Sequence, residues 1–124
     1  MSDEGFTMGL TRTEIKVCST GKPELCRIIK DVIVDTGAVV SAIPLKTAEE
    51  LEISFPIRRT FTLADGSKTT KPVGSAIIEV DGQKAIGEII TSDKPLLGVT
   101  ILEQLGLKVD PSTGKLTQTG ALLL

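Results

Sequence analysis

Turn signals recur at short intervals along this chain, and they leave room only for short strands and helices between them. Asp65-Gly66 and Asp81-Gly82 each separate two strand-like runs, and this dipeptide suits the positive backbone angles of a two-residue hairpin turn. Further turns are expected at residues 19–23 and 110–114, which contain Gly and Pro. This succession is typical of a small antiparallel sandwich or barrel, so we expect a mainly β fold.

Strand-like segments lie on both sides of each of these turns. Residues 10–18 and 25–29 should form the first hairpin. Residues 32–34, Val-Ile-Val, form a continuous apolar run that is too short for a helix, and we interpret it as a strand buried on both faces. This strand ends at Asp35.

Helical signals are few and local. Thr47 with Glu50, and Thr100 with Glu103, have the spacing of a capping box, and Gly106 suits the end of the second segment. We therefore expect one or two short helices.

A weak internal repetition relates the two parts of the chain. A strand that ends at residues 35–37 and is followed by a capped helix parallels the strand, apolar-apolar-Gly loop and capped helix of residues 89–104. The two halves would pack about an approximate twofold axis; chance similarity among aliphatic segments is the alternative.

The composition bounds the architecture and the partners. With 124 residues and 40% hydrophobic content, one compact domain is expected, with an aliphatic core because the chain has three Phe and no Trp or Tyr. The net charge of −2, without a basic stripe, argues against nucleic acid as a partner. The first residues do not resemble a signal peptide and no apolar run could cross a bilayer, so we expect no membrane partner and a cytoplasmic protein.

Cysteine and histidine usage narrows the chemistry. Cys18 and Cys26 flank a turn that could bring them together, but we favour two ordinary buried thiols in a reducing compartment over a disulfide. They cannot complete a zinc site without further ligands, and we expect no metal and no other cofactor. The chain has no histidine, which removes the Ser-His and Cys-His nucleophiles. Carboxylates or lysines must carry any proton transfer.

The tripeptide Asp35-Thr36-Gly37 is the principal candidate for catalysis. It places a carboxylate at the end of a buried strand, beside a hydroxyl and a glycine that lets backbone approach a ligand closely. Taken alone, the tripeptide could equally be a tight turn after a strand.

Three segments together resemble the retroviral-type (retropepsin-like) aspartic peptidases. Residues 34–38, Val-Asp-Thr-Gly-Ala, with residues 41–44, are similar to the active-site loop of that family. Residues 63–66 lie where the family has its flap hairpin, and residues 95–102 resemble its apolar-apolar-Gly loop and following helix. The resemblance spans residues 10–119 approximately and implies a small closed β-barrel. We expect this domain at residues 10–124 and a flexible extension at residues 1–9.

The resemblance also implies a homodimer that cleaves an extended polypeptide. The chain contains one Asp-Thr-Gly, so the second carboxylate would come from Asp35 of another copy across a twofold axis. We expect Thr36 to hydrogen-bond across the dimer and an apolar C-terminal strand to join the interface. The expected catalytic residues are Asp35, Thr36 and Gly37; the expected substrate-binding residues are Gly37, Ala38, Val39, Val40, Ala64, Asp65, Gly66 and Leu97; the expected interface residues are Thr36, Leu122, Leu123 and Leu124.

Two other classes of function stay open. Val39 stands where the family often has a hydroxyl or an acidic residue, and Gly66 is the one glycine of the expected flap, which favours a peptide-binding or dimerisation module without turnover. A carboxylate-based metal enzyme is the third class, although only Asp31 lies near Asp35 in the sequence.

Overall fold

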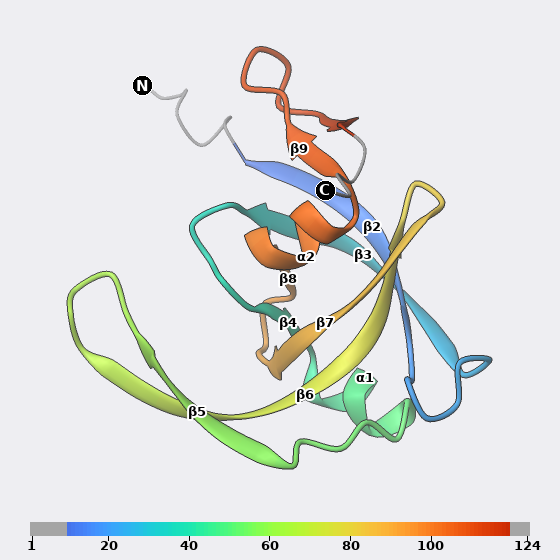
Figure 1. Ribbon diagram of the computed structural model, residues 1–124, viewed down its shortest axis with the longest axis vertical. Helices are drawn as coiled ribbons and strands as arrows, with labels where there is room; N and C mark the ends of the chain where they lie inside the picture. The colour runs from blue at the N-terminus through green and yellow to red at the C-terminus, as the bar shows by residue number, and fades with distance from the viewer. Residues whose placement is uncertain (1–9, 120–124) are drawn as a thin grey trace, which may run out of the picture.

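The computed structural model describes residues 10–119, in which a single sheet wraps around an aliphatic core (Figure 1). Leu122, Leu123 and Leu124, expected in the subunit interface, and the expected extension at residues 1–9 lie outside the described residues. The strands and helices, in chain order, are β2 (Thr11–Cys18), β3 (Cys26–Asp35), β4 (Ser41–Ile43), α1 (Leu45–Glu50), β5 (Ile57–Thr62), β6 (Lys68–Val80), β7 (Gln83–Thr91), β8 (Leu96–Gly98), α2 (Val99–Gln104), β9 (Leu107–Val109) and β10 (Leu116–Gln118).

The expected mainly β fold with two short helices is confirmed. The strand order is β2-β3-β8-β4-β7-β6-β5, and β2 also pairs with β6, so the first six strands of this order form a closed ring of pairings. β9 and β10 form a separate hairpin. Within the described residues no helix is long and apolar enough to cross a membrane.

The pairings have an internal twofold pattern. If β2, β3 and β4 are exchanged with β6, β7 and β8, the antiparallel pair β2–β3 becomes β6–β7, and the parallel pair β3–β8 becomes β7–β4. The pairs β2–β6 and β4–β8 exchange with themselves, and α1 and α2 follow corresponding strands. These pairings support the approximate twofold axis inferred from the repetition. β5 has no counterpart in this exchange.

The first hairpin is confirmed, but its second strand continues through residues 32–34 as one element. Thr13 pairs with Val32 and Ile15 with Ile29, so one residue of β2 opposes two of β3. The two residues of β3 are Lys30 and Asp31, and they form a β-bulge in which Asp31 has a φ of 58°. Because the bulge shifts the side-chain alternation, Ile29 and Val32 both face the core although their spacing is odd.

The two cysteines lie opposite each other in this hairpin and form a disulfide, with 4.1 Å between their Cα atoms. The interpretation as two free buried thiols is therefore wrong. Strand pairing places Cys18 directly opposite Cys26. The sequence spacing alone could not predict this register, because a longer loop between the strands would have placed the two cysteines apart.

The hairpin turns follow their glycines. Asp81 and Gly82, with φ of 51° and 78°, connect Val80 directly to Gln83, which confirms a two-residue turn. The turn at Asp65-Gly66 is longer than predicted: Gly66 N–H donates to Leu63 O at 2.9 Å, Leu63 N–H donates to Ser67 O at 2.7 Å, and three residues lie between. Only Gly66 has a positive φ there, so a type I turn with a glycine bulge replaces the mirror-image turn.

Both helices begin earlier than expected: α1 begins two residues before Thr47, and α2 begins one residue before Thr100. The N-cap residues are Pro44 and Gly98, and neither makes a side-chain capping bond, so the predicted capping boxes are wrong. Each helix follows a buried strand almost directly, which fixes its start without a capping side chain. Gly106, with φ of 71°, does end the second helix, as expected.

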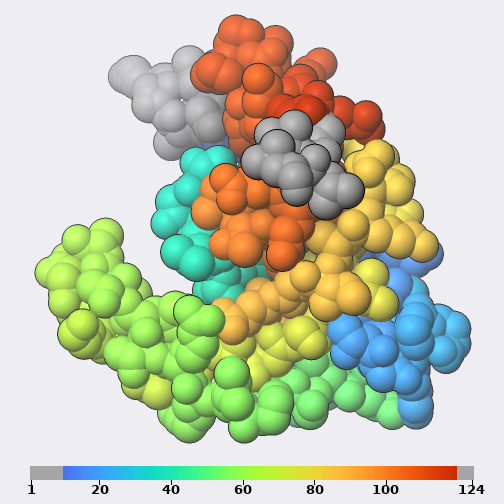
Figure 2. All heavy atoms as spheres, viewed as in Figure 1, coloured from blue at the N-terminus to red at the C-terminus, as the bar shows by residue number. Residues whose placement is uncertain are grey.

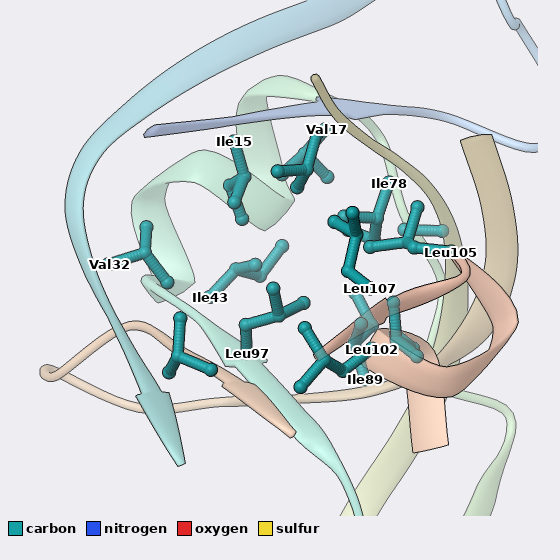
Figure 3. Close-up of a cluster of buried hydrophobic side chains, with 14 of the residues drawn as sticks. Ile15, Val17, Val32, Ile43, Ile78, Ile89, Leu97, Leu102, Leu105 and Leu107 are labelled. Atoms are coloured by element: carbon teal, nitrogen blue, oxygen red, sulfur yellow. The ribbon is translucent and has the colours of Figure 1, made fainter. Parts of the chain in front are cut away.

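The core lies inside the ring of strands and is closed by the helices. Figure 3 shows aliphatic side chains from β2, β3, β4, β6, β7, β8 and α2 converging on one another. Leu51, which caps α1, is 0% exposed in this cluster, whereas Leu45 at the start of the same helix is 58% exposed.

Leu51→Ala should lower the free energy of unfolding by about 2–5 kcal/mol, because it leaves a cavity in a close-packed core. Leu45→Ala is the matched control, because it makes the same chemical change at an exposed position of the same helix. It should change the free energy of unfolding by less than about 0.5 kcal/mol. Urea unfolding followed by circular dichroism measures both. Equal costs for the two variants would contradict this description of the core.

Candidate functional site

Asp35 is the last residue of β3, and its carboxylate is exposed. It lies opposite Gly98 of β8 in the parallel pairing. The N–H of Gly37 donates to Oδ1 of Asp35 at 2.9 Å, and the N–H of Ala38 donates to the Asp35 carbonyl at 3.1 Å. The tripeptide thus does form a turn, and this turn holds one carboxylate oxygen while the other stays available to a ligand.

The loop after Asp35 is attached to β8 and α2 by buried polar contacts. Ser41 is 2% exposed, and its Oγ accepts a hydrogen bond from the N–H of Gly98 at 2.8 Å. The N–H of Val99 donates to Ala38 O at 2.8 Å. A Cβ on Gly98 would lie 2.8 Å from Ala38 O, so glycine is needed for this close approach. The loop is therefore fixed at the Ala38 carbonyl and at the Ser41 side chain.

Asp35 lines a groove of about 640 Å³ that lies between this loop and a projecting ribbon. We call the ribbon the arm and define it as residues 57–72, which comprise β5, its turn and the first part of β6. Figure 2 shows the arm extending away from the body with a hollow between them. Gly37, Ala38, Val39 and Val40 line the groove on the loop side, as expected for substrate-binding residues.

The other expected substrate-binding residues have mixed positions. Ala64 lines the groove from the arm. Asp65 and Gly66 lie at the tip of the arm and are not part of the groove lining in this conformation. The expectation for Leu97 is wrong, because this side chain is 0% exposed and points into the core beside Ile43 and Ile89 (Figure 3).

Strand alternation explains the error at Leu97. Neighbouring residues of a strand point to opposite faces, and Leu96 rather than Leu97 lines the groove. Sequence reasoning also missed most groove residues of the arm, and alternation gave no signal for them, because consecutive residues 59–64 all line the groove. The missed residues that line the groove include Arg59, Phe61, Leu63, Lys71, Ile90 and Leu96.

Thr36 does not line this groove. It borders a separate hollow of about 410 Å³ that also contains Val99, Leu102 and Leu107. Leu102 and Leu107 are buried in the core, at 2% and 3% exposure, so they offer little apolar surface in this hollow beside Thr36.

The internal twofold pattern identifies the position that corresponds to Asp35 in the second half. Ile33 pairs with Leu96, and Ile90 pairs with Ala42, while Ala42 and Leu96 pair with each other. Ile33 thus corresponds to Ile90, and Asp35 corresponds to Ser92. Ser92 also lines the groove, so the second half of the chain presents a hydroxyl where the first presents a carboxylate.

A further hollow on the surface does not contain an unpaired carboxylate from the described residues. A hollow of about 540 Å³ contains Glu52 and Glu88, but Glu52 is paired with Lys22 and Glu88 with Arg59. It lacks Asp35, which is why we place the site in the other groove. Residues 10–119 contain no group of three or more His, Cys, Asp or Glu side chains that could hold a metal ion.

Two solved structures are similar to this chain across most of their length. The simian foamy virus (mac) protease has 19% identity and a TM-score of 0.52, with 74% of this chain and 91% of that chain covered. The EIAV protease, solved with the inhibitor HBY-793, has 20% identity and a TM-score of 0.51, with 82% and 92% covered. No family model and no curated protein matches the sequence. The chain therefore has the retropepsin-like fold, as the sequence resemblance indicated.

The carboxylate at the tip of the arm provides a test of the local geometry. Asp65 accepts hydrogen bonds from the Ser67 hydroxyl at 2.6 Å and the Ser67 N–H at 2.9 Å, which lower the pKa of Asp65 below its ordinary 3.8. A lowered folded-state pKa stabilises the turn above the ordinary pKa, and this contribution is lost as the pH falls through the lowered value.

Ser67→Ala should raise the pKa of Asp65 towards 3.8, because it removes the hydroxyl donor that contributes most. An NMR pH titration of the side-chain carboxyl carbons measures this shift. Ser112→Ala is the matched control, since Ser112 donates to Asp110 through the same two groups and should raise the pKa of Asp110 alone. An unchanged Asp65 titration in Ser67→Ala would contradict the described turn.

Proposed function

We propose that this protein is an aspartic endopeptidase that acts as a homodimer, with Asp35 of each copy supplying one of two catalytic carboxylates. The observation that carries the proposal is the exposed Asp35 carboxylate, which lines a groove of about 640 Å³ and accepts a hydrogen bond from the N–H of Gly37. The retropepsin-like fold supports the proposal, as does Ser92 at the corresponding position of the second half, because one chain then provides one carboxylate and needs a partner.

Two carboxylates brought within a few ångström of each other resist joint ionisation, so the pair retains one proton. The ionised member removes a proton from a bound water, which attacks the scissile carbonyl carbon. The protonated member donates its proton to the carbonyl oxygen. The resulting tetrahedral intermediate collapses as the C–N bond breaks, and a proton passes to the leaving nitrogen.

The neighbouring residues take roles that follow from their positions. Ala38, Val39 and Val40 form apolar subsites beside the scissile bond, and Gly37 presents its carbonyl to an extended substrate. The substrate lies as an added strand between this loop and the arm, whose tip at Ala64, Asp65 and Gly66 closes over it.

Thr36 hydrogen-bonds across the subunit interface in this proposal. Leu122, Leu123 and Leu124 of the chain end complete the proposed contact between copies.

The expected cytoplasmic location stays a prediction. The disulfide between Cys18 and Cys26 argues against a strongly reducing compartment, because such bonds persist mainly in oxidising environments.

Asp35→Asn should reduce cleavage of an unfolded polypeptide by at least about a hundredfold between mildly acidic and neutral pH, because the amide cannot exchange the proton. Peptide products are measured by mass spectrometry. Asp81→Asn is the control, since Asn also suits the positive φ of that hairpin turn and Asp81 lies outside the groove.

Cleavage that survives Asp35→Asn would rule out this mechanism. A wild-type protein that binds peptides but cleaves none, at any pH in this range, would instead favour the peptide-binding module, which Val39 supports because it is 62% exposed in the groove and offers no hydroxyl.

The active species should have twice the 13.1 kDa mass of one chain, because each copy contributes a single Asp35. Sedimentation at several concentrations measures this mass, and activity per chain should fall on dilution together with the dimer. Excess Asp35→Asn protein should suppress wild-type activity by forming mixed dimers. A monomer that cleaves at full specific activity would contradict the shared site.

A further inference from the structure

The arm has a net positive charge, whereas the rest of the protein has a net negative charge. Residues 57–72 contain four Lys or Arg and one acidic residue, Asp65, in a chain whose net charge is −2. Alternation along the ribbon divides these charges between two faces. Arg59 and Lys71 line the groove, whereas Arg58 and Lys68 lie at the alternate positions and do not, although Thr60 and Thr62 at those positions do.

Arg59 and Lys71 lie directly opposite each other in the pairing of β5 with β6. Like charges in such a position repel unless another group neutralises one of them. Arg59 is neutralised: its Nη1 lies 2.7 and 2.8 Å from the two carboxylate oxygens of Glu88, and its guanidinium lies 5.5 Å from the centre of the Phe61 ring. The positive charge of Arg59 is therefore neutralised by Glu88 within the protein.

Lys71 has no such partner. No carboxylate lies within ion-pair distance of its ammonium among residues 10–119, and its side chain is exposed along the groove wall. Within the described part of the chain, Asp35 is the only acidic residue that lines the groove, and the proposed function assigns it to the reaction. Most other lining side chains are small or apolar, so Lys71 is an unneutralised cation in a largely apolar channel.

We propose that Lys71 is a specificity-determining residue that binds an aspartate or glutamate side chain of the peptide in the groove. This inference rests on the proposed function for the identity of the ligand as a polypeptide. An ammonium on a flexible stem suits a carboxylate, and closure of the arm over the peptide would strengthen the contact by excluding water. A homodimer presents Lys71 twice, so the preference occurs at two positions placed symmetrically about the scissile bond.

The test uses peptides that are acetylated and amidated, so that a side chain supplies the only added carboxylate. In a peptide cut by the wild type, each position in turn is changed to Glu, Gln or Lys. Glu should raise kcat/KM over Gln by about threefold to fivefold at the two symmetric positions. The ratio should approach one in 1 M salt, where the Debye length is about 3 Å.

Charge variants assign this preference to a residue. Lys71→Gln should bring the Glu-to-Gln ratio to about one, and Lys71→Glu should invert it in favour of Lys. Lys68→Gln is the matched control, because it removes the same charge from the same ribbon outside the groove and should leave the ratio unchanged. A ratio that survives Lys71→Gln, or that falls equally in Lys68→Gln, overturns the proposal.

Binding separates this inference from the proposed activity. Fluorescence anisotropy with labelled Glu, Gln and Lys peptides, designed on an apolar octapeptide, is measured on Asp35→Asn protein with and without Lys71→Glu. A preference for Glu that inverts with Lys71→Glu, without cleavage by the wild type, supports the Lys71 site and overturns the peptidase. Cleavage without any Glu preference overturns only the Lys71 site, and absence of both binding and cleavage overturns both.

Discussion

The parallel pairing of β3 with β8 is the constraint on which the site depends. It places Asp35 opposite Gly98, and the contacts around Gly98 then fix the loop that follows the carboxylate. Ser41 contributes a buried hydroxyl to a backbone N–H, and an unsatisfied N–H at this depth would cost about 1–3 kcal/mol. The position of the carboxylate thus follows from the core packing of both halves rather than from the Asp-Thr-Gly turn alone.

The internal twofold pattern repeats the framework around the groove without repeating the carboxylate. The exchange of β2, β3 and β4 with β6, β7 and β8 preserves every pairing of the ring, yet it relates Asp35 to Ser92. The backbone framework is repeated, while the acidic group is not. The geometry of the framework and the chemistry of the site are therefore separate properties of this fold.

Much of the architecture could be predicted from the sequence because its signals are local. Turn residues such as Asp81-Gly82 require particular backbone angles, and the apolar run before Asp35 does form a strand, although Ile33 is half-buried and only one face is fully buried. Some local signals failed too, as at the two capping boxes and the Asp65-Gly66 turn. The failures with most consequence for the site concern pairing register and face. Leu97 faces the core because of the register of β8, and the disulfide depends on Cys18 facing Cys26 across a hairpin. Neither fact can be obtained from residue types without the positions of neighbouring strands.

The arm does not contribute a buried side chain to the core, unlike the strands of the ring. From Ile57 to Pro72 every described side chain is exposed or half-buried, and burial resumes only at Val73. The ribbon is consequently held by its own ladder of hydrogen bonds and by the bond of Arg59 to Glu88, and not by the core. Insertions, deletions or grafted sequences near its turn would thus change how far it reaches over a ligand at little cost to global stability, so this segment can diversify while the ring of strands stays the same.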